Sequence, residues 1–193
     1  DDVRGLHIHR DPREVVISAY LYHLRCDEQA EPWCFVPGDK ISPADSFPSI
    51  PYVVQEINSE SESASYIQYL NGATYRDNLK RMSQDEGLTF EIGGYSRYVL
   101  DKMSAWDFQD DRFSNLTFEQ LMSNFQETFE HAFKFLGLSA QQIDKALAIA
   151  RRHDVNTFSD TQLSSNKHIA SPKKVKRHEY FSPFVKDAYH NQF

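Results

Sequence analysis

The sequence predicts an α/β fold, in which short strands alternate with helices. Residues 4–10 and 112–118 each alternate loosely between apolar and polar side chains and end at a turn, which is typical of a strand. A helix start follows the first segment, and a long stretch with apolar side chains along one helix face follows the second. Strands separated by helices in this way indicate a parallel sheet with helices packed against it.

The helix after the first strand has a well-marked beginning. Asp11 suits the N-cap, Pro12 falls at the first helical position, and Glu14 can reach back to the cap amide. We expect this helix to run to about Leu24. Residues 32–52 then contain five prolines and one glycine, which predicts a long irregular loop of the kind that often carries function. Residues 59–65 are interpreted as a solvated linker or a helix start.

The remainder of the chain is predicted to be mainly helical. Residues 73–104 follow a helical pattern with a break at Gly93-Gly94, and one helix is expected over 118–136, with Gly137 as its stop. A second capping box predicts a helix over 139–152. Residues 156–174 are expected to be loop, and the tail from 178 onward a short docked helix. No internal repeat is present, so residues 1–193 are predicted to form one domain.

Composition excludes several classes of protein. Forty per cent of the 193 residues are apolar and 13% aromatic, which is enough for a core. The net charge of -7 argues against a nucleic-acid partner. There is no apolar run of about 18 residues, so no membrane span is expected. No signal peptide is visible, and two cysteines in a chain of this length are expected to be reduced, which favours a cytoplasmic protein.

The junction between the first strand and its helix carries the chemistry. Arg10 stands at the strand end, where α/β proteins bind ligands, and the amino end of the helix points its free N–H groups at the same place. A guanidinium can grip a phosphate in two places, and Ser18, two helical turns on, can meet the same anion. A surface ion pair for Arg10 and a backbone-bonded hydroxyl for Ser18 remain open alternatives.

The segment HRDPREVVISAYLYH, residues 9–23, resembles the arginine-to-serine segment that binds the 3′-phosphate in sulfotransferases, which use 3′-phosphoadenosine 5′-phosphosulfate (PAPS). The resemblance places Arg10 and Ser18 on the 3′-phosphate. Residues 116–139 resemble a second family segment, with Phe118 in place of the tyrosine that borders the adenine and Gln120 in place of an aspartate. Residues 156–161 resemble the adenine-holding segment, which implies a polar contact from Thr157 and a stacking face on Phe158.

Two departures from the family pattern qualify the resemblance. The basic tail lacks the family's Arg-Lys-Gly segment, and Lys173 and Lys174 are the best substitutes on the 3′-phosphate, with a solvated basic stretch as the alternative. The Gly-rich 5′-phosphosulfate loop and the general-base histidine, which precede the arginine in the family, have no counterpart in residues 1–193. We therefore expect a P-loop-like sulfotransferase fold that is incomplete at its N-terminal side: a fragment of a longer domain, or a protein that has lost catalysis.

The resemblance implies a function and its partners. It implies a sulfotransferase that moves a sulfuryl group from PAPS to a hydroxyl or amine of a small or lipid-like acceptor, without a metal. Residues 1–193 would supply the 3′-phosphate and adenine site and would be inactive alone. A homodimer contact or a further segment is expected to cover the open sheet edge. An inert interaction module on the same fold is the main alternative, and a P-loop kinase relative is a weaker one, since Arg151-Arg152 ends a helix.

Other candidate sites in the sequence are weaker. His7 and His9 share one face of the first strand and could bind a metal, but no third ligand lies at a diagnostic spacing, so structural histidines are favoured. Cys26 and Cys34 form no Cys-x-x-Cys motif, which gives zinc or redox roles little support. Asn115 begins a glycosylation sequon that is expected to stay bare because it lies in a strand.

Overall fold

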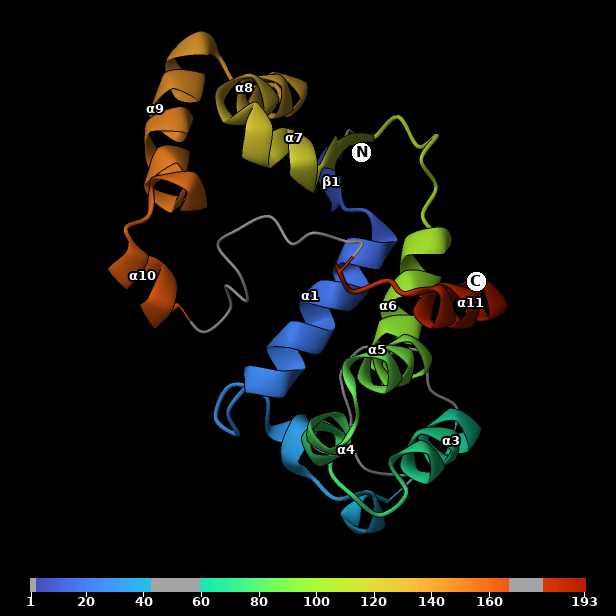
Figure 1. Cartoon of the computed structure of the whole chain (residues 1–193). Helices are drawn as coiled ribbons and strands as arrows, with labels where there is room; N and C mark the ends of the chain where they lie inside the picture. Colours follow the sequence, from blue (N-terminus) through green and yellow to red (C-terminus); the bar gives the residue numbers. More distant parts are fainter. Residues whose placement is uncertain (1–2, 43–59, 167–178) are drawn as a thin grey trace. The chain divides into compact units, whose positions relative to one another are not determined.

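The structure, a computed structural model, describes residues 3–42, 60–166 and 179–193 (Figure 1). Two compact units divide the chain. The strand unit comprises residues 1–11 and 105–166, and the helical unit comprises residues 12–104 and 167–193. Each unit is described by itself below. That residues 1–193 form one domain stays a prediction, whereas the α/β class with a small parallel sheet and many helices is confirmed.

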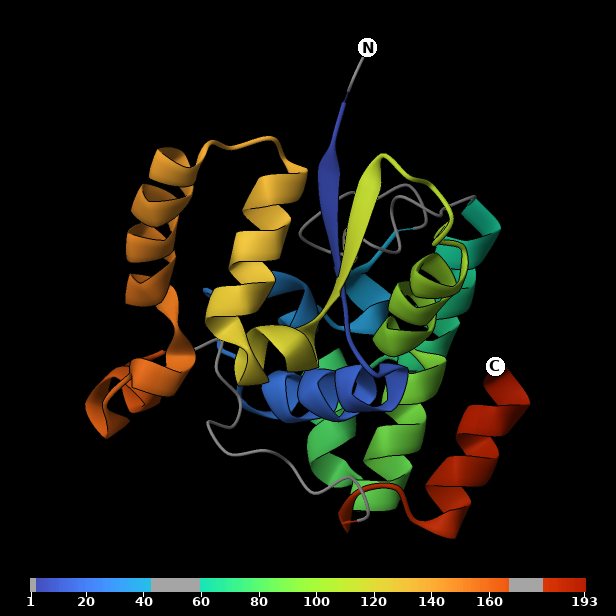
Figure 2. The same ribbon diagram turned by 90° about the horizontal axis from the view of Figure 1, so that it is seen from above.

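The strand unit is built around the two predicted strands. Strand β1 (Gly5–His9) pairs in parallel with β2 (Phe113–Thr117), with Gly5 opposite Phe113 and His9 opposite Thr117. Figure 2 shows the two strands side by side. Among the described residues these are the strands of the sheet. Because they are parallel, both strands end at the same edge, and the residues that follow them leave the sheet together.

The single helix expected over residues 118–136 is wrong, because the chain breaks at Asn124. Helix α7 (Phe118–Ser123) ends there, and α8 (Phe125–Phe135) begins on the other side. Asn124 lies outside the helical region, with φ -129° and ψ 47°. The Thr128 hydroxyl lies 2.8 Å from the Asn124 carbonyl and 3.2 Å from the Gln120 carbonyl. The Thr128 hydroxyl therefore donates to backbone carbonyls where the two helices separate. Gly137 ends α8 with φ +83°, as its position predicted.

The segment after α8 is more helical than expected. Helix α9 (Ala140–Ala150) begins with the predicted capping box, and the short 3₁₀ helices η3 (Arg151–His153) and η4 (Val155–Thr157) follow. The loop expected from residue 156 is wrong over α10 (Asp160–Ser165). A further capping box, formed by Ser159 and Gln162, starts this helix. The same local signal therefore nucleates α9 and α10.

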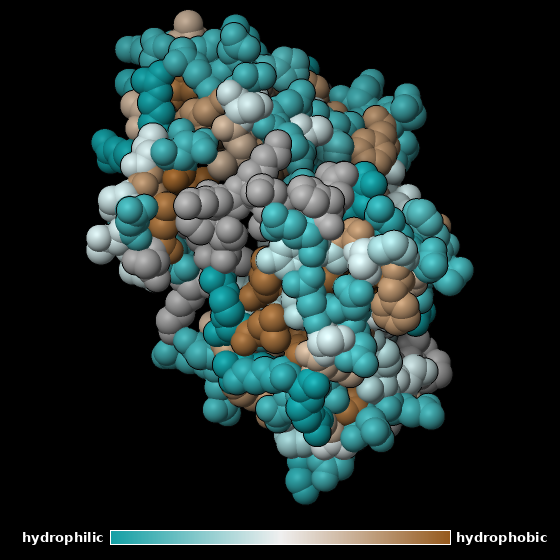
Figure 3. All heavy atoms as spheres, in the orientation of Figure 1, coloured by the Kyte–Doolittle hydropathy of each residue, from teal (hydrophilic) through white to brown (hydrophobic). Residues whose placement is uncertain are grey.

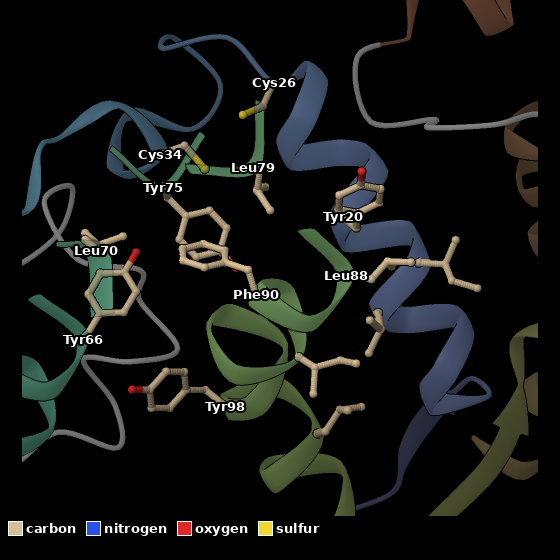
Figure 4. Packing of buried hydrophobic residues seen from close by; sticks show 14 of the residues in the cluster. Tyr20, Cys26, Cys34, Tyr66, Leu70, Tyr75, Leu79, Leu88, Phe90 and Tyr98 are labelled. Carbon is tan, nitrogen blue, oxygen red and sulfur yellow. The ribbon is translucent and has the colours of Figure 1, made fainter. Parts of the chain in front are cut away.

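The helical unit contains α1 (Pro12–Arg25), α3 (Glu60–Leu70), α4 (Tyr75–Arg81), α5 (Gln84–Gly93), α6 (Tyr95–Ser104) and α11 (Pro183–Gln192). The predicted helix after Asp11 and the break at Gly93-Gly94 are both confirmed, but the pattern predicted over 73–104 also breaks at Met82, where the backbone is extended and Ser83 caps α5. The buried core mixes aromatic and aliphatic side chains (Figure 4), with Tyr66, Tyr75 and Phe90 packed among aliphatic residues. A Cβ on Gly87 would lie 2.7 Å from the Tyr20 ring, so α5 approaches α1 closely at this glycine.

The described part of the proline-rich loop belongs to this core. It forms η1 (Pro32–Phe35) and η2 (Gly38–Lys40), while residues 43–52 lie outside the described residues. Trp33 is 3% exposed and stacks on Tyr95, with ring centroids 5.3 Å apart. An irregular loop is therefore the wrong description of residues 32–40, because the aromatic side chain of Trp33 gains more from burial than from exposure.

The C-terminal helix α11 confirms the short docked helix predicted for the tail, and it packs on α5. The Ser182 hydroxyl donates to the Asp85 carboxylate at 2.7 Å, and Gln84 donates to the Glu179 carbonyl at 2.8 Å. Phe181 and Val185 are buried beside these contacts. None of the described helices combines the length and the apolar character needed to cross a bilayer. Figure 3 shows a mostly hydrophilic surface on the viewed face, interrupted by separate hydrophobic patches.

Candidate functional site

Arg10 and Phe118 lie together at the carboxyl ends of the paired strands. His9 faces Thr117 in the register, so the next residue of each strand leaves the sheet at the same edge. The Arg10 guanidinium carbon lies 4.7 Å from the centroid of the Phe118 ring, within the range of a cation–π contact. Two residues that the sequence assigned to one nucleotide are thus neighbours at the edge where parallel sheets bind ligands.

The position of Phe118 is set by the start of α7. The Thr117 hydroxyl accepts from the Gln120 amide at 3.0 Å, and the Gln120 side chain accepts from the Thr117 amide at 2.8 Å. This capping box holds the first turn of the helix, which Phe118 begins. The glutamine that replaces the family's aspartate therefore has a structural role. Phe118 remains 37% exposed, so part of the ring is open to a ligand.

Thr157 and Phe158 are held next to α7 by the segment that carries them. The Asn156 side chain donates to the Met122 carbonyl of α7 at 3.0 Å, and the Asp154 carboxylate accepts from the Asn156 amide at 3.0 Å. The Thr157 hydroxyl donates to the Asp154 carbonyl at 2.7 Å, which leaves its oxygen able to accept another hydrogen bond. Phe118 begins α7, and the segment with Thr157 and Phe158 is bonded to its last turn. Helix α7 therefore joins the two segments that are predicted to hold the adenine.

The other predicted site residues do not belong to the described part of the strand unit. Ser18 lies on α1, in the helical unit, and is partly exposed. Its convergence with Arg10 on one phosphate stays a prediction. Lys173 and Lys174 lie outside the described residues. The structure therefore groups Arg10, Phe118 and the Thr157–Phe158 segment in the strand unit, and the roles of all seven residues remain proposals.

The two histidines of β1 belong to an aromatic cluster. The His7 ring stacks on Trp106 with centroids 4.0 Å apart, and Phe108 contacts both His7 and His9. Asn115 joins this cluster through three hydrogen bonds, to His7 (2.9 Å), Trp106 (3.1 Å) and the Phe108 carbonyl (3.2 Å). Among the described residues no group of three His, Cys, Asp or Glu could hold a metal ion.

Replacing Asn115 with alanine is expected to destabilise β2. The change leaves the Trp106 indole and His7 ring, which are both partly buried, without their acceptor, which costs on the order of 1 kcal/mol. Hydrogen exchange of residues 113–117 should rise accordingly. Asn124→Ala is the control, because the Asn124 side chain is exposed and makes no capping hydrogen bond. Equal exchange in the two variants would contradict a structural role for Asn115.

Sequence reasoning missed a buried polar network in the helical unit. Glu91 is 0% exposed and His23 2%. One oxygen of the Glu91 carboxylate accepts from the His23 ring (2.9 Å) and the Tyr75 hydroxyl (3.0 Å). The other oxygen accepts from the Ser96 hydroxyl (2.9 Å). Burial alone would lower the pKa of His23, but attraction to and hydrogen bonding with Glu91 outweigh it, so this pKa is raised. A carboxylate inside the apolar run LTFEIGG was the available signal.

The His23–Glu91 pair is expected to make the stability of the helical unit depend on pH. A raised folded-state pKa means that the stabilisation is complete below the unfolded value, about 6.5, and is lost as pH rises through the folded value. The urea midpoint should therefore fall from about pH 6.5 upward. The measurement uses the Cys26→Ser, Cys34→Ser variant to remove thiol ionisation. Adding His23→Gln should make the urea midpoint less dependent on pH. A midpoint that rises with pH above about 6.5 would contradict a stabilising role for the pair.

Comparison with known proteins gives one match. The family described as "Sulfotransferase domain" matches residues 1–193, which is the whole chain. No curated protein and no solved structure matches.

Proposed function

The chain belongs to the sulfotransferase domain family, which makes it a transferase of sulfuryl groups, and from this premise we propose that its donor is PAPS. Residues 1–193 supply the site for the 3′-phosphate and the adenine of that donor, on a P-loop-like fold. The contact between Arg10 and Phe118 carries the proposal. It combines a fixed positive charge and an aromatic face at the carboxyl edge of a parallel sheet, which suits a phosphorylated nucleoside.

Each residue has a chemical role in the proposed site. Arg10 grips the 3′-phosphate through its planar fork, and the Ser18 hydroxyl donates to the same phosphate. Phe118 borders the adenine and Phe158 stacks on it. Because the Thr157 proton is donated to the Asp154 carbonyl, the Thr157 oxygen accepts from the adenine amino group. Lys173 and Lys174 add positive charge near the 3′-phosphate.

The site contributes to transfer by positioning the donor. An acceptor hydroxyl or amine attacks the sulfur, a base removes its proton, and the 5′-phosphate leaves. Holding the adenine and the 3′-phosphate fixes the sulfur relative to the acceptor and so lowers the entropic part of the barrier. We propose a small or lipid-like acceptor.

Calorimetry with two nucleotides tests the proposal. 3′-Phosphoadenosine 5′-phosphate (PAP) should bind at least about tenfold more tightly than adenosine 5′-phosphate, since the 3′-phosphate adds charge-assisted hydrogen bonds. Equal affinities would contradict a 3′-phosphate site. Absence of binding to both would favour the inert interaction module. A radiolabelled sulfate-transfer assay over phenols, alcohols and amines then identifies the acceptor, and transfer by residues 1–193 alone would contradict the expectation that this segment is inactive by itself.

A further inference from the structure

The chain's two cysteines meet in the core of the helical unit. Cys26 directly follows α1 and is 5% exposed, and Cys34 lies in η1 and is 0% exposed. Figure 4 shows both sulfur atoms in the same region of the core, beside Leu79 and Tyr75. Hydrogen bonding between the two thiols affects the titration of each of them. Both thiols are free in this structure.

The turn between the cysteines is held by hydrogen bonds that return the chain to α1. The Asp27 carboxylate accepts from the Ala30 amide at 2.8 Å, and the Glu31 amide donates to the Asp27 carbonyl at 3.0 Å. The Glu31 carboxylate accepts from the Tyr22 hydroxyl (2.8 Å) and the Trp33 indole (2.6 Å). Glu31 thus ties η1 to α1, and the two thiols are neighbours because the fold holds them there.

The surroundings make the two thiols chemically unequal. Hydrogen bonding with Cys34 lowers the pKa of Cys26, and the nearby charges of His23 and Arg76 lower it further against the opposing effect of burial. Burial raises the pKa of Cys34. Cys26 is therefore the more readily ionised of the two thiols; in this structure it is protonated and donates to the His23 carbonyl at 3.2 Å. A thiolate with a protonated thiol beside it is the arrangement of an oxidisable cysteine with its resolving partner.

We infer that Cys26 and Cys34 form a redox site that a small hydroperoxide converts to a disulfide. The Cys26 thiolate attacks one oxygen of hydrogen peroxide, which breaks the O–O bond, releases hydroxide and leaves a sulfenic acid on Cys26. The Cys34 sulfur then attacks the Cys26 sulfur. The S–O bond breaks, and the Cys34 proton leaves with the hydroxyl as water. The two sulfurs are oxidised by two electrons together, and the peroxide is reduced.

Because both thiols are buried, only a small oxidant can reach them. A buried thiol is closed to bulky disulfides, but hydrogen peroxide is close to water in size. Cys26 is 5% exposed and the nearby turn residues Glu28 and Gln29 are exposed, so a small opening of this turn is enough to admit an oxidant of this size. The disulfide would join the end of α1 to η1. The η1 segment carries Trp33, whose ring contacts the rings of His23 and Tyr95. Oxidation should therefore stabilise the helical unit.

Peroxide treatment of the whole chain, followed by mass spectrometry, tests the site. Trypsin leaves both cysteines in residues 26–40, and the disulfide should lower the mass of this peptide by about 2 Da. Further cleavage after Glu28 should release the two cysteine fragments separately only after reduction. The oxidised chain should also unfold at a temperature several degrees higher than the reduced chain, on the order of 4 °C or more.

Single substitutions assign the roles. In Cys34→Ser, peroxide should leave a sulfenic acid on Cys26 that dimedone captures, whereas the wild-type chain should give the disulfide and little adduct. In Cys26→Ser, Cys34 should stay unmodified, because its raised pKa keeps it protonated. Both cysteines alkylating fully after peroxide treatment, or a dimedone adduct on wild-type Cys26 without a disulfide, would overturn the inference.

Discussion

Replacing Glu91 with alanine is expected to lower the free energy of unfolding of the helical unit by about 3–5 kcal/mol. The substitution removes one carboxylate and leaves the donors of His23, Tyr75 and Ser96 without their acceptor inside the core. Each orphaned buried donor costs about 1–3 kcal/mol. Because a domain is stable by only about 5–15 kcal/mol, the variant should lose a large share of its stability.

Urea unfolding followed by tryptophan fluorescence measures this loss. The chain has two tryptophans, Trp33 in the helical unit and Trp106 in the strand unit, so a Trp106→Phe background reports on the helical unit alone. Ser96→Ala is the matched control, because it removes one donor and leaves the carboxylate in place, and it should cost about 1 kcal/mol. A loss below 1 kcal/mol in Glu91→Ala would show that the network contributes little to stability.

Replacing Arg10 with alanine is expected to weaken the binding of PAP by about 1.5–3 kcal/mol, or roughly tenfold or more. The guanidinium is the charged group at the strand edge that the proposed 3′-phosphate would meet, and its loss removes charge-assisted hydrogen bonds. Affinity for adenosine 5′-phosphate should change little, since this nucleotide lacks the 3′-phosphate. The difference between the two ligands separates a lost phosphate contact from a general distortion of the site.

Arg4 provides the control for this experiment. It precedes β1 at the opposite end of the strand, donates to the Phe135 carbonyl at 3.1 Å and lies over the Phe135 ring at 5.8 Å. It therefore matches Arg10 in residue type and in its contact with an aromatic ring. Arg4→Ala should leave the affinity for PAP unchanged. Arg10→Lys should fall between the wild type and Arg10→Ala, because it keeps the charge but loses the fork. Equal losses in Arg4→Ala and Arg10→Ala would contradict the assignment.

Elements with local signals were predictable from the sequence. Asp11 and Pro12 mark the start of α1, and Ser139 with Gln142 marks the start of α9, because a capping signal depends on residues within one turn. The break at Asn124 was not predictable, because the apolar pattern continues through it without interruption. Helix α10 was missed because it has no apolar periodicity, although its capping box is the same signal that starts α9.

The candidate site also contains features that local sequence signals predict and features that they do not. The strand-end positions of Arg10 and Phe118 follow from local patterns, and parallel pairing is enough to bring them to one edge. Their likeness to a nucleotide-binding segment is also a property of short stretches of chain. Local patterns carry no information about how the helical unit packs around α1, and Ser18 consequently stays a prediction from spacing and resemblance.

The sequence by itself determined the family, the two strands, the helix starts marked by capping signals and the residues at the strand ends, because each depends on neighbours a few positions apart. Only the tertiary structure decided which distant side chains meet. His23 and Glu91 are 68 positions apart and form a buried pair, and Cys26 and Cys34 become neighbours through a turn that Glu31 holds in place. Such contacts depend on how helices pack, since burying an aromatic core leaves each polar group inside it only the partners that the packing supplies.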